Sequence, residues 1–366
     1  MKVVNLIWGF TLGAGIDKCY MTYAGLHDAD PTIEVKNVCI NVKSRNSHLD
    51  PLKAIGVSFI DIDNPLDFSW VTILKKVIVD YQTDVLFTHG FNGAIISLIE
   101  KWLCRIHVPI VLTYHGAYHA PTKKKKLVEG LYNGLTHFIY KHIAKKTICV
   151  AEYSRQYLLK KGIPDNRLVT VHNGIKDIDV CNKNPVRMNP DIINILTASR
   201  IDKVKGLYDM LDAIEILHKR GVKFHYYMVG EGPELNKLKM ICKQKGLDQY
   251  VSFEGFQNYV HQWLDAADIF ALPSLYEYHS IAILEAMRAG KAIVATTVGG
   301  NGESIDDMKQ GILVPPGNPV AFADGLECII NDESLRKKIS AAARERFLCE
   351  FTEDVMKRNL IKVLKS

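Results

Sequence analysis

Short apolar runs alternate with amphipathic stretches along the whole chain. The apolar runs are rich in Val and Ile, as expected for strands covered on both faces, and the stretches between them carry apolar residues at helical spacing. This alternation is typical of parallel sheets with crossover helices, so the predicted fold class is α/β. The predicted strands are 2–8, 35–40, 57–61, 84–88, 109–113, 147–150, 168–171, 192–198, 223–229, 250–253, 268–272, 291–295 and 311–314. The predicted helices include 69–80, 92–105, 126–143, 153–161, 206–219, 233–245, 281–289, 318–331 and 333–347.

The periodicity breaks between residues 174 and 191. Gly174, Pro185 and Pro190 lie in this stretch with several Asn residues, which is typical of a linker. A chain of 366 residues also exceeds the size at which a single core usually stops growing. We therefore predict an N-terminal Rossmann-like domain at 1–180, a C-terminal Rossmann-like domain at 181–350, and a C-terminal helix at 351–366 that packs back on the first domain.

Composition favours a globular protein of the cytoplasm. Hydrophobic residues make up 48% of the chain and charged residues 23%, and no window is apolar enough to span a bilayer. The apolar run at 2–8 is interpreted as a buried strand and not as a secretion signal. Eight cysteines are scattered without Cys-x2-Cys spacing, which favours reduced thiols over disulfides or a zinc site.

The segment 273–300 carries the strongest chemical pattern. Glu277 follows the predicted strand 268–272, and Glu285 comes eight positions later on the predicted helix that follows. Because the first carboxylate lies on a loop, both can face one ligand, and each can accept hydrogen bonds from hydroxyl groups. The alternative is a charge at a helix N-terminus and a surface glutamate. The flanking strand and the Gly299-Gly300 pair favour the binding role.

Two cations follow the predicted strand 192–198. Arg200 and Lys205 precede Gly206, at the carboxyl end of a strand where open parallel sheets bind ligands. Fixed cations at that place would stabilise the negative charge that develops on a departing diphosphate. Solvated surface charges are the alternative interpretation.

These segments together resemble the donor site of family 4 retaining glycosyltransferases of GT-B fold. The resemblance rests on Glu277-x7-Glu285 with Ala286-Met287, and on three further segments in the same order: Arg200-x4-Lys205-Gly206, Val229-Gly230-Glu231-Gly232 and Phe253-Glu254-Gly255. It implies two Rossmann-like domains facing each other across a cleft. It also implies an enzyme that uses a UDP- or GDP-sugar as donor, with no cofactor and no metal.

The resemblance implies a role for each matching position. Arg200, Lys205 and Glu277 would be catalytic, and Glu285 would hold the ribose. The remaining donor-binding positions are Gly230 and His279, Phe256 and Gln257 against the base, and Ser280, Ile281 and Ala282, whose N–H groups would face the diphosphate. The N–H groups that open a helix face anions in this way. The family usually has small residues where this chain has Tyr278 and Ser280, which leaves the choice of sugar open.

Two features of the first half match the family more loosely. The glycine loop Gly13, Ala14 and Gly15 follows strand 2–8 and precedes a helix, so its backbone N–H groups are expected to approach the acceptor or an anion. His115 and Gly116 follow strand 109–113, and His115 is expected to bind a sugar hydroxyl or position the acceptor as a catalytic residue. A tight turn and a structural histidine are the alternatives.

A basic stretch lies between residues 123 and 161. Its nine lysines and one arginine are interleaved with apolar residues, and the excess of basic residues in the chain lies in its first half. A basic amphipathic face of this kind binds anionic membrane surfaces, so we expect peripheral association with the inner face of the cytoplasmic membrane. A solvated helix face is the alternative. Nucleic acid is not expected as a partner because no recognition motif accompanies the charge.

The sequence therefore predicts a retaining glycosyltransferase that moves a sugar from a nucleotide diphosphate to an acceptor hydroxyl. The expected acceptor is a lipid-linked glycan in the synthesis of a surface polysaccharide or glycolipid. A nucleotide-sugar epimerase on the same scaffold is one alternative, and a non-catalytic protein that binds sugar nucleotides or polyanions is another.

Overall fold

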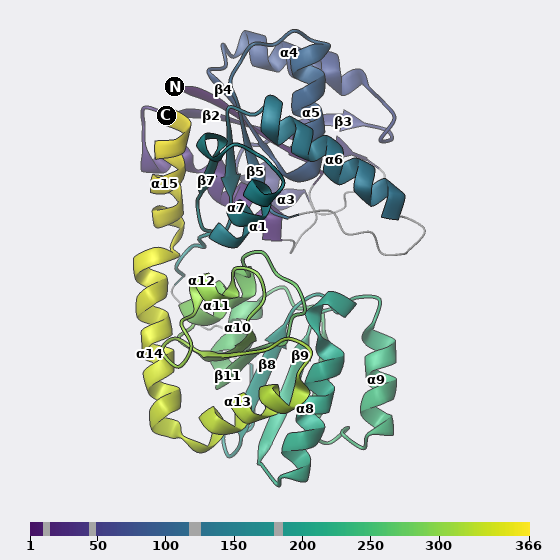
Figure 1. Cartoon of the computed structure of the whole chain (residues 1–366), viewed down its shortest axis with the longest axis vertical. Coiled ribbons are helices and arrows are strands. Elements are labelled where there is room, and N and C mark those ends of the chain that lie inside the picture. Colours follow the sequence, from purple (N-terminus) through teal and green to yellow (C-terminus); the bar gives the residue numbers. More distant parts are fainter. Residues whose placement is uncertain (10–14, 44–48, 117–125, 179–185) are drawn as a thin grey trace. The chain divides into compact units, whose positions relative to one another are not determined.

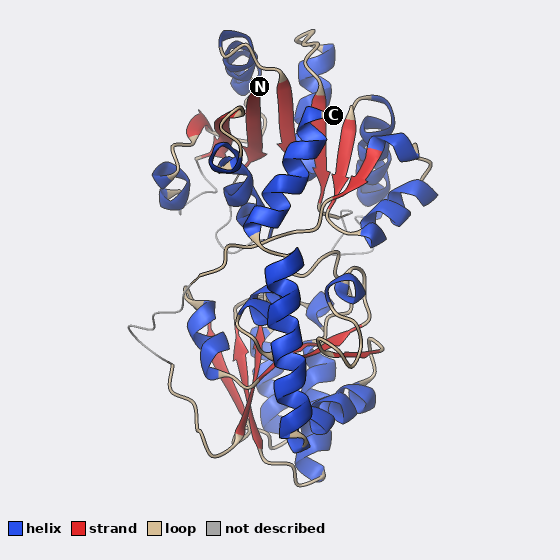
Figure 2. Ribbon diagram, turned by 90° about the vertical axis from the view of Figure 1, so that its left-hand side faces the viewer, coloured by secondary structure: helices blue, strands red, loops and turns tan. Residues whose placement is uncertain are grey.

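The computed structural model describes residues 1–9, 15–43, 49–116, 126–178 and 186–366. The chain divides into two compact units (Figure 1). The N-terminal unit comprises Met1–Lys176 and Glu353–Ser366, and the C-terminal unit comprises Asp177–Thr352. Each unit has a central sheet with helices on both sides of the strands (Figure 2).

The N-terminal unit contains a seven-stranded parallel sheet with the order β3-β2-β1-β4-β5-β6-β7. Its strands carry buried Val, Ile and Leu side chains, as the apolar runs require. The predicted strands of this half are confirmed, with ends that differ by at most two residues. The strands are β1 (Lys2–Trp8), β2 (Glu34–Val42), β3 (Ser58–Ile62), β4 (Val85–His89), β5 (Ile110–Tyr114), β6 (Lys146–Cys149) and β7 (Leu168–Thr170).

The helices of the N-terminal unit include the last helix of the chain. They are α1 (Gly15–Ala24), α2 (Leu26–Ala29), α3 (Asp50–Ala54), α4 (Ser69–Asp80), α5 (Gly90–Trp102), α6 (Lys126–His142), α7 (Glu152–Lys160), the 3₁₀ turn η2 (Asp165–Arg167) and α15 (Glu353–Lys365). Helix α15 contacts α1 and α2, and Lys365 forms an ion pair with Asp30 at 2.5 Å. The end of the chain thus completes the unit in which the chain begins.

The C-terminal unit contains a six-stranded parallel sheet with the order β10-β9-β8-β11-β12-β13. All six strands were predicted from the apolar runs and are confirmed. The strands are β8 (Ile193–Ala198), β9 (Phe224–Val229), β10 (Val251–Gly255), β11 (Ile269–Leu272), β12 (Ala292–Thr296) and β13 (Ile312–Val314). The helices are η3 (Lys203–Lys205), α8 (Leu207–Lys219), α9 (Leu235–Gln244), α10 (Val260–Ala266), α11 (Ile281–Arg288), α12 (Asn301–Ser304), α13 (Pro319–Asn331) and α14 (Glu333–Glu350).

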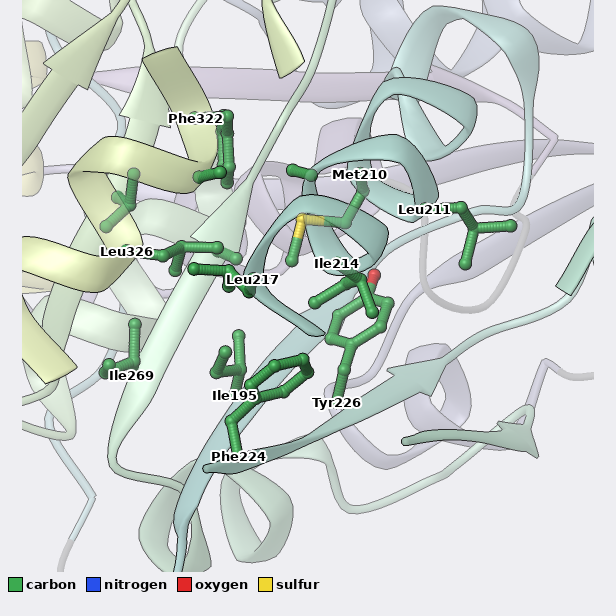
Figure 3. Close-up of a cluster of buried hydrophobic side chains, with 14 of the residues drawn as sticks. Ile195, Met210, Leu211, Ile214, Leu217, Phe224, Tyr226, Ile269, Phe322 and Leu326 are labelled. Atoms are coloured by element: carbon green, nitrogen blue, oxygen red, sulfur yellow. The ribbon is translucent and has the colours of Figure 1, made fainter. Parts of the chain in front are cut away.

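The hydrophobic core of the C-terminal unit packs against the two central strands of its sheet, β8 and β11. Side chains of α8 and α13, such as Ile214 and Leu326, pack on Ile195 of β8 and Ile269 of β11, and all four are fully buried (Figure 3). Burial of one such side chain contributes about 1.5–3 kcal/mol. The carboxyl ends of β8 and β11 are therefore held on a rigid base.

Candidate active site

Strands β8 and β11 form the switch point of the C-terminal sheet. Starting from this neighbouring pair, the strand order runs outward in opposite directions, to β9 and β10 on one side and to β12 and β13 on the other. Ligands of open α/β sheets bind outside the carboxyl ends of the strands at such a point. The segments that follow β8 and β11 contain four of the predicted site residues: Arg200, Lys205, Glu277 and Glu285.

Lys205 and Glu277 are in direct contact. Nζ of Lys205 lies 2.6 Å from Oε1 of Glu277, and the hydroxyl of Ser274 donates to the same oxygen at 2.8 Å. The two charged side chains are only 22% and 12% exposed, so water screens the pair weakly. The contact fixes the orientation of the carboxylate at the end of β11 and places an ammonium group beside it.

Two glycines allow neighbouring loops to approach the backbone of the loop that holds Glu277. Gly206 has φ +62°, and a Cβ at this position would lie 2.0 Å from the carbonyl oxygen of Pro273. Gly299 has φ +55°, and a Cβ there would lie 1.7 Å from the carbonyl oxygen of Glu277. Both positions require a left-handed backbone and a missing side chain. The glycines therefore bring the loops after β8 and β12 against the loop that holds Glu277.

Helix α11 carries Glu285 and begins next to Glu277. Ser280 caps the helix by accepting a hydrogen bond from the N–H of Ile283 at 3.4 Å. The N–H groups of the first turn, including those of Ile281 and Ala282, have no acceptor within a helix and can face an anion. Glu285 is half-buried one turn later. Burial lowers the pKa of Arg288, and the carboxylate of Glu285 is the largest influence in the opposite direction.

Arg200 is placed differently from Lys205. Its side chain is 68% exposed, and Nη2 lies 2.8 Å from Oδ2 of Asp202. Asp202 is its ion-pair partner among the described residues, so the structure does not bring Arg200 into contact with Glu277. The reason is local: the 3₁₀ turn η3 and the left-handed Gly206 follow Arg200 and direct only Lys205 toward β11.

Three predicted donor-binding residues, Gly230, Phe256 and Gln257, lie at or just beyond the ends of β9 and β10. The N–H of Gly230 donates to the carbonyl of Gly255 at 2.7 Å, which joins the two strand ends. Phe256 follows with 49% of its surface exposed, and Gln257 donates to the carbonyl of Glu254 at 2.8 Å. An exposed aromatic ring at this edge is suited to stacking against a base.

His279 has an inward position. It is 6% exposed, its Nε2 lies 3.2 Å from the hydroxyl of Ser304, and its ring centroid lies 5.7 Å from that of Phe351. The ring thus packs between α12 and the end of α14. Its side chain supports the loop before α11, and a role in donor binding stays a prediction.

His115 lies at the carboxyl edge of the N-terminal sheet, directly after β5. Its Nε2 lies 3.0 Å from the hydroxyl of Thr113. Burial lowers the pKa of His115 from 6.5 to about 4, so the imidazole is neutral at physiological pH. Of the predicted glycine loop, Gly13 and Ala14 lie outside the described residues, and Gly15 is the first residue of α1.

His89 is not among the predicted site residues, but the structure joins it to His115 through Thr113. Nδ1 of His89 lies 2.9 Å from the hydroxyl of Thr113 and its Nε2 2.6 Å from Oδ1 of Asn5. The signal was present in the sequence: His89-Gly90 ends the strand next to β5, and His115-Gly116 follows β5 in the same way.

The basic stretch divides into two parts in the structure. Helix α6 exposes Leu131, Leu135 and Phe138, with Lys141 and Lys145 exposed at and beyond its end. Other basic groups are held within the protein: Arg155 pairs with Glu152 and Asp165, and Lys146 donates to the carbonyl of Asn166. The lysines at 123–125 lie outside the described residues, and so do the side chains of 126–129.

In the described part of the chain, no helix combines the length and the apolar character needed to cross a bilayer. Nor do the described His, Cys, Asp and Glu side chains form a group of three or more suited to a metal ion. The prediction that catalysis requires no metal stays a prediction.

Known families match both halves of the chain. Residues 182–346 match the model described as glycosyl transferases group 1, and residues 45–177 match the model of glycosyltransferase family 4. The amylovoran biosynthesis glycosyltransferase AmsK of Erwinia amylovora is 32% identical over 301 residues, which are 78% of this chain and 70% of AmsK. WcaL of Escherichia coli strain K12, named for colanic acid biosynthesis, is 29% identical over 218 residues. That alignment covers 57% of this chain and about half of WcaL, 53%.

Solved structures show the same fold at low identity. Anabaena Alr3699/HepE in complex with UDP-glucose aligns with a TM-score of 0.82 at 18% identity, over 100% of this chain and 99% of that one. The sucrose-phosphate synthase of Thermosynechococcus elongatus aligns with a TM-score of 0.81 at 17% identity, over 100% and 98% of the two chains. The predicted α/β architecture of GT-B type is thereby confirmed.

Proposed function

The chain belongs to the family 4 glycosyltransferases of GT-B fold, and we propose that it transfers a sugar from a nucleotide diphosphate to an acceptor hydroxyl with retention of configuration. The observation that carries the proposal is the contact between Lys205 and Glu277 at the switch point of the C-terminal sheet. An ammonium group for a diphosphate and a carboxylate for a sugar hydroxyl lie side by side there, next to the N-terminus of α11.

The donor is a UDP- or GDP-sugar that binds along the carboxyl edge of the C-terminal sheet. Glu285 accepts hydrogen bonds from the ribose, Glu277 from a sugar hydroxyl, and Phe256 stacks on the base. Support comes from the exposed ring of Phe256 and from the half-buried carboxylate of Glu285 on the same edge. The structural neighbour HepE, which was crystallised with UDP-glucose, supports a UDP-sugar as the first donor to try.

The reaction breaks the bond between the anomeric carbon and the diphosphate oxygen. A bond from the acceptor oxygen to the same carbon forms on the same face, and the acceptor proton passes to the departing phosphate. Lys205 stabilises the negative charge on that phosphate, with Arg200 as a second cation, so the cations supply what a bound metal supplies elsewhere. No protein side chain is required as covalent nucleophile in this scheme.

The acceptor is a lipid-linked glycan, bound at the N-terminal unit. Relatives named for amylovoran and colanic acid biosynthesis support a role in polysaccharide synthesis. The exposed apolar side chains of α6 support contact with a membrane: Leu131, Leu135 and Phe138 are 67%, 41% and 46% exposed, and lysines follow at 141 and 145. An apolar stripe flanked by cations is the pattern of helices that lie in an anionic membrane surface.

The direct test is incubation with a panel of nucleotide sugars, with and without membrane-extracted lipid-linked glycans. Release of nucleoside diphosphate that depends on the acceptor, with a glycosylated product of retained configuration, is the expected result. Conversion of the donor alone into another nucleotide sugar would instead identify an epimerase. Binding of nucleotide sugars without any turnover would identify a non-catalytic binding protein.

A further inference from the structure

A row of polar side chains crosses four neighbouring strands of the N-terminal sheet. It runs from Asn37 on β2 through Asn5 on β1 and His89 on β4 to Thr113 on β5, and it ends at His115. Asn5 and Asn37 are register partners, and so are His89 and Thr113. The first four side chains are buried among the apolar residues of the sheet. A buried polar row of this kind is stable only when every member finds a partner.

The direction of the hydrogen bonds is set at the end of the row away from His115. Nδ2 of Asn37 donates to the carbonyl of Ala24 at 3.3 Å, and a carbonyl can only accept. Oδ1 of Asn37 therefore faces Asn5 and accepts from its Nδ2 at 2.8 Å. Oδ1 of Asn5 is then the atom that faces Nε2 of His89, at 2.6 Å, so His89 must carry a proton on Nε2.

The hydrogen bonds continue from His89 through Thr113 to His115 in the same direction. A neutral His89 with a proton on Nε2 has a lone pair on Nδ1, which accepts from the hydroxyl of Thr113 at 2.9 Å. The oxygen of Thr113 is then left to accept from Nε2 of His115 at 3.0 Å. Nδ1 of His115, to which no described residue is hydrogen-bonded, remains as an acceptor at the carboxyl edge of the sheet.

The opposite direction of the hydrogen bonds is excluded by the contact between Nε2 of His89 and Oδ1 of Asn5. If His115 carried its proton on Nδ1, Thr113 would donate to it and His89 would have to donate to Thr113. A neutral His89 would then turn a lone pair toward the oxygen of Asn5. A charged His89 would avoid this clash, but burial, with His115 as a second cause, lowers the pKa of His89 well below 6.5. Its ring is also stacked on Tyr23 at 4.9 Å.

We propose that Asn5, His89 and Thr113 are positioning residues that hold His115 with its proton on Nε2, so that Nδ1 accepts a hydrogen bond from a substrate hydroxyl. The identity of that substrate as the acceptor glycan rests on the proposed function. The tautomer of His115 does not rest on the proposed function, because the row is built entirely from side chains and one backbone carbonyl of this chain.

The tautomer is measured by NMR of the full-length protein with ¹³C,¹⁵N-labelled histidine. The His115 resonances are identified as those lost in the His115→Gln variant. The expected result is a neutral imidazole protonated on Nε2 in the wild type, and a shift toward the Nδ1-protonated form in Thr113→Val. A wild-type His115 protonated on Nδ1 would overturn the proposal, whatever the activity of the protein.

The consequence for substrate is measured by steady-state kinetics. Thr113→Val is expected to lower kcat/KM roughly tenfold, the effect of about one hydrogen bond, and Thr113→Ser to restore it by returning the hydroxyl. Thr147→Val is the matched control, because Thr147 is buried on the neighbouring strand β6 and its hydroxyl has no hydrogen-bond partner among the described residues. Its kinetics should equal those of the wild type.

The outcomes separate the two proposals. Equal kcat/KM in Thr113→Val and the wild type, with an altered tautomer, would overturn the role of Nδ1 toward substrate. Absence of sugar transfer in the wild type, with the Nε2-protonated tautomer present, would refute the proposed function and leave the row of hydrogen bonds supported.

Discussion

Lys205 and Glu277 are 72 positions apart in the sequence, and their charged atoms lie 2.6 Å apart in the structure. Each follows a different central strand of the C-terminal sheet, and the parallel topology brings the two strand ends to the same edge. The pair is therefore a product of the fold. Under the proposed function, the diphosphate of the donor would interact with an ammonium group whose position a carboxylate already fixes.

Replacement of Lys205 tests the cation at this edge. Lys205→Ala should lower kcat about 100-fold or more, because the positive charge acts mainly on the phosphate that leaves in the transition state. Release of nucleoside diphosphate measures the effect. Lys203→Ala is the matched control, because Lys203 lies on the same 3₁₀ turn and is exposed. Equal loss in both variants would mean that the turn matters and the charge at 205 does not.

Replacement of Glu285 tests donor binding. Glu285→Gln should weaken binding of the nucleotide sugar roughly 10- to 100-fold, because hydrogen bonds to a charged acceptor contribute about 1.5–3 kcal/mol. Calorimetric titration with the nucleoside diphosphate alone measures the ribose contact without turnover. Glu345→Gln, on the exposed side of α14, serves as control. Unchanged affinity in Glu285→Gln would remove this residue from the donor site.

Replacement of Gly299 tests whether the close approach of its backbone holds the loop with Glu277 in place. Gly299→Ala should reduce the free energy of unfolding by about 2 kcal/mol or more and abolish transfer, because φ is +55° and the new Cβ meets the carbonyl of Glu277. Gly302→Ala is the matched control, since a Cβ there has nothing within 4 Å and lies in a helix. Thermal unfolding compares the two variants. A fully active Gly299→Ala protein would contradict the close approach.

The exposed stripe of α6 tests membrane association. Simultaneous change of Leu131, Leu135 and Phe138 to Ser should lower affinity for anionic vesicles at least tenfold, because each exposed side chain loses apolar area that membrane insertion would bury. Co-sedimentation with phosphatidylglycerol and with phosphatidylcholine vesicles measures the affinity. Met240→Ser on α9, also exposed, should bind like the wild type. Equal binding by all three proteins would refute the proposed membrane surface.

Desolvation of the half-buried His115 ring predicts its titration. Its pKa is lowered from 6.5 to about 4, so below pH 6.5 the unfolded chain binds a proton that the folded protein does not. This group therefore lowers the free energy of unfolding as the pH falls from about 6.5 to about 4. The chemical shift of the imidazole ¹³Cε1–H group measures the midpoint directly. A midpoint near 6.5 would show that the ring is solvated in the native state.

Much of the fold was predictable because a parallel strand covered on both faces is an almost continuous apolar run. All thirteen strands of the described residues follow from this pattern. The edge that carries Lys205 and Glu277 was predictable too, because residues that follow neighbouring parallel strands meet. The exposed position of Arg200 was not predictable. It depends on the 3₁₀ turn η3, which changes the direction of the chain shortly after Arg200.

Only the His89 and His115 end of the polar row had a signal in the sequence, and the Asn5 and Asn37 end had none. Asn5 and Asn37 lie inside apolar strands, where a single polar residue does not alter the period. They form a hydrogen-bonded row only because the strand register places them opposite each other and because the neighbouring strand brings His89 to Asn5. Neither relation is local in sequence.

The return of α15 to the N-terminal unit has a consequence for biosynthesis. Met356, Leu360 and Leu364 of this helix are buried, and the N–H of Gly174 donates to the sulfur of Met356 at 3.0 Å. Domains usually fold in the order in which the ribosome releases them. Here the N-terminal unit must wait for residues 353–366, which are translated after the whole C-terminal unit, before its apolar surface is covered. Removal of residues 353–366 would thus expose apolar surface of the N-terminal unit, although more than 170 residues separate the two segments in the sequence.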